Sequence, residues 1–243
     1  MIKVDSLLYK IDQRLNKLSS NSHQQIPLED KILALNEAQI KLIKQKVSGI
    51  STVSRAGRDS FKKRYDDLQG IIEEYTDHPL NLTLADDNLN RYEANLEDLD
   101  PKYMLHIDSY ILADKDNCKN RIIWTNVELL KHGDIQFLLN NEHFKPSFEY
   151  QETFSSISKN KISIFTDGTF TPKQLYLMYI RYPAYINKAG YIQLDGSSST
   201  DVDCELVLYL EDELLDLTVQ NLAMYTENAA AVQSAQFRIQ TDE

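Results

Sequence analysis

Glycine is scarce in this chain: 243 residues contain only 7, under half the average usage of about 7%. Loops that hold phosphate groups or expose a nucleophile need glycines at fixed spacings. The sequence contains no G-x-G-x-x-G, no G-x-x-x-x-G-K-S/T and no G-x-S-x-G, and it also lacks C-x-x-C and H-E-x-x-H. We therefore expect no cofactor and assign no catalytic residue, which points away from the common enzyme classes.

Long apolar runs and cysteines are also few. The longest unbroken apolar run, Leu175 to Ile180, is far shorter than the roughly 20 residues that span a bilayer. No apolar segment of the secretory type follows the first residues, so we expect neither a membrane contact nor a secretory signal. Only two cysteines are present, Cys118 and Cys204, which favours reduced, intracellular packing residues over a disulfide framework.

Charge is unevenly distributed along the chain. Acidic residues outnumber basic ones by 37 to 26, and the net charge of −11 disfavours general nucleic-acid binding. Between Lys41 and Arg64, however, there are eight basic residues against the single acid Asp59. Residues 189–237 contain nine acids and no Lys or Arg. Such polarity favours association with another copy or with a complementary neighbour. The open alternative is two solvated helix faces.

Helical periodicity dominates both ends of the chain. Apolar residues recur there at three- and four-residue steps, with charged residues between them. Pro27, followed by Glu29 and Asp30, marks the start of one helix. Ser199, Thr200 or Asp201 is expected to cap another. The predicted helices cover residues 4–18, 27–49, 55–75, about 200–225 and 229–240.

The middle of the chain has the composition of strands. Segments rich in Ile, Val, Tyr and Trp predict strands over 103–112, 121–130, 147–154, 161–166, 173–182 and 191–194. Residues 133–140 are expected to form one or two helical turns, and 79–99 a loop with a short acidic turn. Asp167-Gly168 is typical of a tight turn. The unbroken apolar run at 175–180 predicts a strand covered on both faces.

These patterns predict an α+β fold, in which an amphipathic helical bundle from the N- and C-terminal segments carries a β-rich insertion. The expected domains are an N-terminal helical arm at 1–25, a helical core at 26–100 and 195–243, and the insertion at 101–194.

Candidate chemical sites are weak. The five histidines lack metal-ligand spacing, which favours surface or turn positions. The pairs Asp86-Asp87 and Asp114-x-Asp116 have the chemistry of a divalent-cation site, although a hairpin loop explains the second pair better. Ser197-Ser198-Ser199 has no local base and is interpreted as a loop. The 14 tyrosines could stack on bases, but core packing is preferred.

Three stretches carry a resemblance to a known family. The helix containing Leu35-Asn36-Glu37-Ala38-Gln39-Ile40 resembles the "NEAQ" helix near the start of tailed-bacteriophage head-to-tail connector proteins. The run from Cys204 to Asn228 is similar to the closing helix of those proteins. Tyr179-Ile180-Arg181-Tyr182-Pro183 resembles the Y-I-R-x-P segment that ends a strand in related virion proteins, including ring proteins of crAss-like phages.

The resemblance implies a structural virion protein rather than an enzyme. Such proteins form a ring, commonly twelve-fold, that docks beneath the portal, extends the DNA channel and carries the next tail component. The implied partners are further copies of the chain, the portal protein and other ring or tail proteins, with DNA passing through without sequence-specific contact. The implied location is the neck of the virion, after assembly in the host cytoplasm.

The charge pattern adds two expectations to this picture. A channel that DNA traverses should not hold phosphate, so we expect acids to face the lumen or an adjoining subunit, namely Glu211, Asp212, Glu213 and Asp216. We expect a basic set to meet an acidic surface of a neighbouring subunit or of the portal, namely Arg55, Arg58, Lys62, Lys63 and Arg64. Two alternatives stay open: a metal-dependent nucleic-acid-processing enzyme, and a monomeric binding module that uses the tyrosine-rich sheet.

Overall fold

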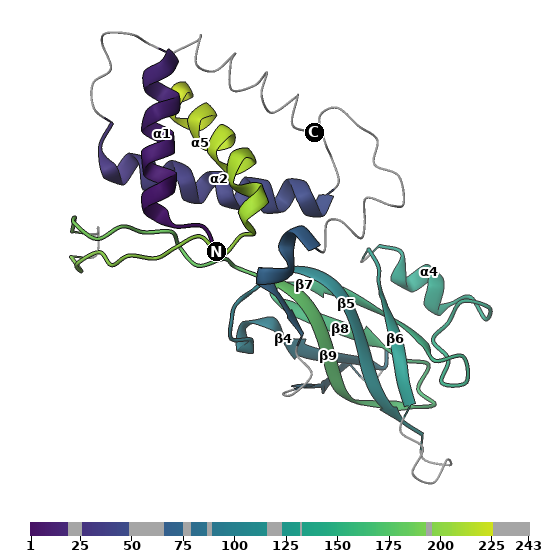
Figure 1. The fold of residues 1–243 in the computed structure, drawn as a ribbon. Coiled ribbons are helices and arrows are strands. Elements are labelled where there is room, and N and C mark those ends of the chain that lie inside the picture. The colour runs from purple at the N-terminus through teal and green to yellow at the C-terminus, as the bar shows by residue number, and fades with distance from the viewer. Residues whose placement is uncertain are drawn as a thin grey trace. The chain divides into compact units, whose positions relative to one another are not determined.

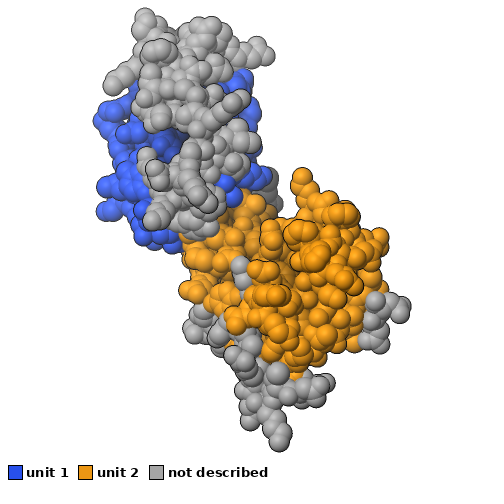
Figure 2. Space-filling model, turned by 90° about the vertical axis from the view of Figure 1, so that its right-hand side faces the viewer, with its two compact units in different colours: residues 1–71, 183–243 blue, residues 72–182 orange. Residues whose placement is uncertain are grey.

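The computed structural model describes residues 1–18, 26–48, 66–74, 79–86, 89–115, 123–131, 133–192 and 196–225. Helices and strands are both abundant, so the predicted α+β class is confirmed. The chain divides into two compact units, coloured separately in Figure 2. Unit 1 comprises residues 1–71 and 183–243, and unit 2 comprises residues 72–182. No helix of the described ranges is both long and apolar enough to cross a membrane.

Unit 1 contains α1 (Val4–Leu18), α2 (Leu28–Ser48) and α5 (Glu211–Tyr225), which the 3-10 turn η3 (Leu208–Leu210) precedes (Figure 1). The first two helices have the predicted positions, because their apolar stripes and acidic first turns are local signals. Helix α5 packs against both α1 and α2. Its residues 214–220 are all buried, so α5 is the central helix of the unit.

Helix α5 starts about ten residues later than predicted. Residues 201–205 are extended instead, and form bridges from Val202 to Asn187 and from Cys204 to Ile2. The acids of this segment accept backbone N–H groups elsewhere: Asp201, a predicted cap, that of Ala189, Asp203 that of Val4 and Glu205 that of Ala184. The predicted cap is therefore wrong, because these side chains bind other segments.

A two-stranded arm precedes α5. Residues 184–192 and 196–204 run side by side (Figure 1), joined by the bridges Asn187↔Val202 and Ile192↔Ser198. The strand predicted over 191–194 is thus represented by the Ile192 bridge, and residues 193–195 lie outside the described residues. The root of the arm is buried at Ile186 and Asn187, whereas Ile192 near its end is 73% exposed.

Unit 2 is built on a sheet with nine strands among the described residues, in the order β1-β9-β5-β6-β7-β8-β4-β3, with β2 also paired to β9. All pairings are antiparallel except β6 with β7. The strands are β1 (Ile72–Glu74), β2 (Leu80–Asn81), β3 (Thr83–Asp86), β4 (Arg91–Asn95), β5 (Tyr103–Asp114), β6 (Ile123–Leu129), β7 (Glu152–Ser158), β8 (Lys161–Phe165) and β9 (Thr171–Arg181).

One core lies on the inner face of this sheet. It includes Ile111 of β5, Val127 of β6, Ile164 of β8 and Leu177 of β9, all of them buried. On another part of the sheet, Phe154 and Phe165 pack with Ile135 of the short helix α4 (Ile135–Leu139). The remaining short elements are the 3-10 turns η1 (Gln69–Ile71) and η2 (Leu96–Asp98).

Three local predictions for this region are corrected. Residues 79–99 contain β2, β3 and β4 rather than a loop. The helix predicted to Tyr75 gives way to η1 and β1, and the strand predicted at 147–154 begins only at Glu152. Gly168 does adopt a turn conformation with φ +80°, but β8 and β9, which flank it, pair with other strands.

The run at 175–180 is fully covered on one face and only partly on the other. Leu175, Leu177 and Tyr179 are buried on one face, whereas on the other Ile180 is buried and Tyr176 and Met178 are half-buried. Tyr176 stacks on Tyr110 of β5 with 5.4 Å between the ring centroids. The predicted cover on both faces is therefore only partly present, because the stacked tyrosine gives the outer face an apolar composition without burying it fully.

Candidate functional site

Helix α2 places two polar side chains on its buried side. Asn36 is 5% exposed, and it makes two hydrogen bonds to the backbone of Ile186 at the root of the arm. Its amide nitrogen donates to the Ile186 carbonyl over 2.9 Å, and its amide oxygen accepts from the Ile186 N–H over 2.8 Å. A buried extended backbone needs such partners, and Asn36 supplies both.

The same helix also contacts the segment before α5 and the end of α5. The Gln39 amide nitrogen lies 3.9 Å from Cys204 Sγ, and Cys204 is completely buried. Burial raises the pKa of the Cys204 thiol to about 11. On the exposed side of α2, Glu37 accepts a hydrogen bond of 2.7 Å from the Tyr225 hydroxyl. Residues 36, 37 and 39 of one helix thus bind three separate parts of unit 1.

The four acids predicted to face a lumen or a neighbour form ion pairs within the chain. Glu211 accepts from Lys10 at 2.6 Å. Arg14 of α1 binds both Asp212 and Asp216, each at 2.5 Å. The side chain of Asp216 is only 2% exposed, so the expected position at a lumen or subunit surface is corrected for this residue.

Two of those acids remain accessible. Asp212 is the most exposed, at 71%, and Glu213 is 30% exposed while it pairs with Lys46 of α2 at 2.7 Å. Their role at a channel or subunit contact stays a prediction. The five predicted basic residues lie outside the described residues, namely Arg55, Arg58, Lys62, Lys63 and Arg64.

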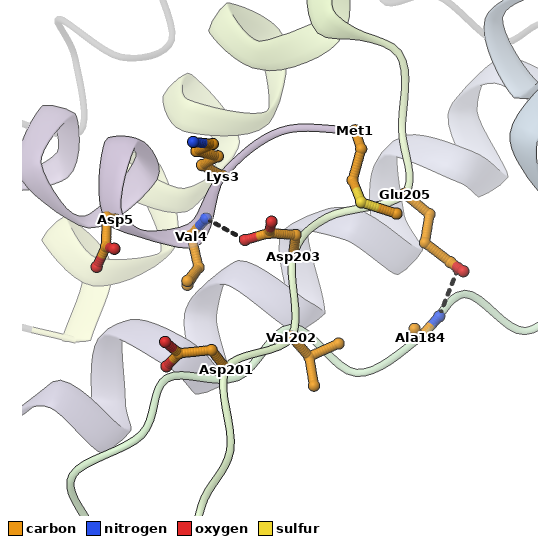
Figure 3. Close-up of a pocket in the computed structure, with 9 residues that line it drawn as sticks. All are labelled: Met1, Lys3, Val4, Asp5, Ala184, Asp201, Val202, Asp203 and Glu205. Atoms are coloured by element: carbon orange, nitrogen blue, oxygen red, sulfur yellow. Dashed lines mark hydrogen bonds between the residues drawn. The ribbon is translucent and has the colours of Figure 1, made fainter.

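A cavity of about 450 Å³ opens beside the start of α1. Figure 3 shows its lining, in which the carboxylates of Asp203 and Glu205 turn toward the backbone nitrogens of Val4 and Ala184. The full lining is Met1, Lys3, Val4, Asp5, Ala184, Asp201, Val202, Asp203 and Glu205. Four carboxylates against one lysine and the amino group of Met1 make this lining acidic.

Lys188 of the arm partly neutralises one side of the cavity. Its ammonium group lies 2.9 Å from Asp5 and 3.1 Å from Asp201, and these hydrogen bonds raise the pKa of Lys188. The pKa of Asp201 is lowered, first by the Ala189 N–H and then by Lys188. Within the described part of the chain, no three His, Cys, Asp or Glu residues are grouped so that they could hold a metal ion.

The other residues considered in the sequence have structural roles where they are described. His106 lies half-buried in β5, not in a turn, and its Nε2 is 3.1 Å from Ser109 Oγ. Burial lowers the pKa of His106. Asp114 pairs with Lys173 at 2.6 Å, and Ser199 donates to the Tyr191 carbonyl. Asp87, Asp116 and the histidines 23, 78 and 132 lie outside the described residues.

Sequence reasoning missed the contacts of Asn36 and Gln39. The signal was present, because both polar residues lie among the apolar positions of a helix, where an amide needs a buried partner. The identity of that partner depends on tertiary structure. Neither protein-family models nor curated proteins match the chain.

Proposed function

We propose that this protein is a structural virion protein that forms a head-to-tail connector ring. In this proposal the ring docks on the portal, extends the DNA channel and carries the next tail component. One observation carries the proposal: two of the three stretches that resemble connector proteins, the helix around residues 35–40 and the run that starts at Cys204, pack together in unit 1. The third stretch ends β9 of unit 2 and enters unit 1 at Pro183. Asn36 binds Ile186, three residues after Pro183, and Gln39 and Glu37 contact Cys204 and Tyr225 of the C-terminal run.

The finer architecture belongs to the same proposal. The helices of unit 1 are the bundle, with residues 1–25 as its N-terminal arm, and the sheet of unit 2 is the insertion. Asp212 is the acid best exposed to line a channel, and the net charge of −11 suits a passage that does not hold DNA phosphates. The protein would be assembled in the host cytoplasm and would reside in the neck of the virion.

The test is the mass of the purified full chain in solution, alone and mixed with the portal protein of the same virus, by mass photometry. Twelve copies of 28.1 kDa would weigh about 337 kDa. We expect a ring-sized species, either in the chain alone or in the mixture, where it adds to the mass of the portal. Negative-stain class averages should show a closed ring.

A 28.1 kDa monomer that ignores the portal would overturn the proposal. Cleavage of DNA or RNA that EDTA abolishes would favour the enzyme alternative. A stable monomer that binds another ligand through its sheet would favour the binding module.

A further inference from the structure

One face of α2 is exposed along its whole length. Leu33, Glu37, Lys41 and Lys44 are all exposed and are spaced by three or four residues, so they form one stripe, named here the outer α2 face. Leu33 leaves 48% of its surface uncovered. Neither Lys41 nor Lys44 has an ion-pair partner among the described residues.

An acidic surface lies on the other side of the same helix. Asn36 and Gln39, on the buried side of α2, bind the extended segments at Ile186 and Cys204. Those segments continue into the cavity lining, whose carboxylates are named here the acidic rim: Asp5, Asp201, Asp203 and Glu205. Lys3, Lys188 and the amino group of Met1 oppose these four negative charges locally, so the rim keeps a net negative charge.

The geometry of a helix separates the two surfaces. Successive side chains are rotated by about 100°, so the direction of positions 33, 37, 41 and 44 is opposite to that of the buried positions 35, 39, 42 and 43. The lysines of the outer α2 face therefore point away from the segments that carry the acidic rim. A single copy cannot bring the two surfaces into contact.

We propose that the outer α2 face docks against the acidic rim of a second copy of the chain. The opposite charges of the two surfaces make them complementary. The exposed Leu33, in the N-terminal half of α2, adds an apolar contact with the second copy. Because the two surfaces differ, the contact is head-to-tail, and repetition of such a contact closes a ring or extends a filament. This inference rests on the proposed connector function and names its subunit contact.

The test exchanges the charges of the two surfaces. Variant A carries Lys41→Glu and Lys44→Glu, and variant B carries Asp5→Lys and Asp201→Lys. Asp5 and Asp201 are the exposed members of the rim, and Asp201 also accepts the Ala189 N–H. Asp203 and Glu205 are left intact because they are half-buried and bind backbone N–H groups. Each variant alone then presents two surfaces of like charge and should remain at 28.1 kDa by mass photometry, under conditions in which the native chain assembles.

Mixing is the decisive step. In an equimolar mixture, the acidic rim of A meets the basic α2 face of B, and the acidic α2 face of A meets the basic rim of B. The ring-sized species should therefore return, with A and B alternating. A chain with all four substitutions should also assemble alone. Lys131→Glu with Lys145→Glu, at exposed positions of unit 2, is the matched control and should assemble like the native chain.

Three results would overturn the inference. Variant A could assemble as the native chain does, or the mixture of A and B could stay monomeric although both melt like the native chain by circular dichroism. Variant A could also assemble normally but lose binding of duplex DNA, which would make the outer α2 face a DNA contact.

A neutral variant, Asp5→Asn with Asp201→Asn, removes the two acids without placing new lysines beside Lys188. It should weaken assembly, and adding variant A should not restore the ring. Failure of the native chain to assemble, even with portal, would instead overturn the proposed function.

Discussion

Asn36 and Ile186 exchange two hydrogen bonds although 150 residues separate them in the sequence. One side-chain amide thereby satisfies both backbone groups of a buried residue. The contact fixes the root of the two-stranded arm to α2, the helix that carries one of the stretches on which the proposed function depends.

Replacing Asn36 tests this contact. Asn36→Leu should lower the free energy of unfolding of the chain by about 2–4 kcal/mol, because the buried N–H and C=O of Ile186 lose their partners. Urea unfolding followed by circular dichroism measures the change. Glu37→Ala, the adjacent exposed position, should cost less than about 1 kcal/mol. Equal effects at the two positions would contradict the assigned role of Asn36.

Arg14 gives a second stability test. It binds the buried Asp216 and the exposed Asp212 at once. Arg14→Gln should destabilise the protein by about 3–5 kcal/mol, because Asp216 keeps its charge inside unit 1 without this counter-charge. Asp212→Asn should cost at most about 1 kcal/mol, as exposed ion pairs do. Arg14→Leu combined with Asp216→Leu should recover much of the loss in the same urea experiment. No recovery would mean that Arg14 acts through packing instead.

The elements that could be predicted are those with signals inside one segment. The stripe of Val4, Leu7, Ile11 and Leu15 predicts α1, because helical spacing alone decides which side is buried. The strands β5, β8 and β9 are long or strongly apolar, so the sequence also predicts them. In contrast, β2 has two residues and only Ala94 of β4 is fully buried, so neither shows a usable alternation.

Failures at the candidate site have a common physical cause. Asp201 is a predicted helix cap, yet its carboxylate accepts the N–H of Ala189 instead. Asp216 looks like a surface charge, yet Arg14 allows it to be buried. In both cases the sequence shows the group that needs a partner, and only the tertiary structure supplies the partner.

The reactivity of Cys204 reports on the packing between Gln39 and the extended segment. Burial raises the pKa of this thiol to about 11, so very little thiolate exists at pH 8 and access is blocked as well. In a Cys118→Ser background, Ellman's reagent should label no thiol in the folded protein and one thiol per chain in urea. Rapid labelling of the folded protein at pH 8 would show that the segment opens. Gln39→Ala should increase the labelling rate of the folded protein.

Tyr103 makes the stability of the protein depend on alkaline pH. Burial raises the pKa of its hydroxyl to about 12, against 10 in an unfolded chain. Between these two values the unfolded state releases a proton that the folded state still holds, so the free energy of unfolding must fall as pH rises. The contribution of Tyr103 is complete below about pH 10 and is lost toward pH 12. The native chain should therefore lose more stability between pH 9 and pH 11.5 than the Tyr103→Phe variant, as measured by urea midpoints.

Tyr150→Phe, at a position that is 81% exposed, is the matched control and should follow the native chain. The other tyrosines cancel from the comparison because all three proteins keep them, apart from the residue replaced. Parallel pH curves for the native chain and Tyr103→Phe would refute the assignment, because the extra proton would then be held elsewhere.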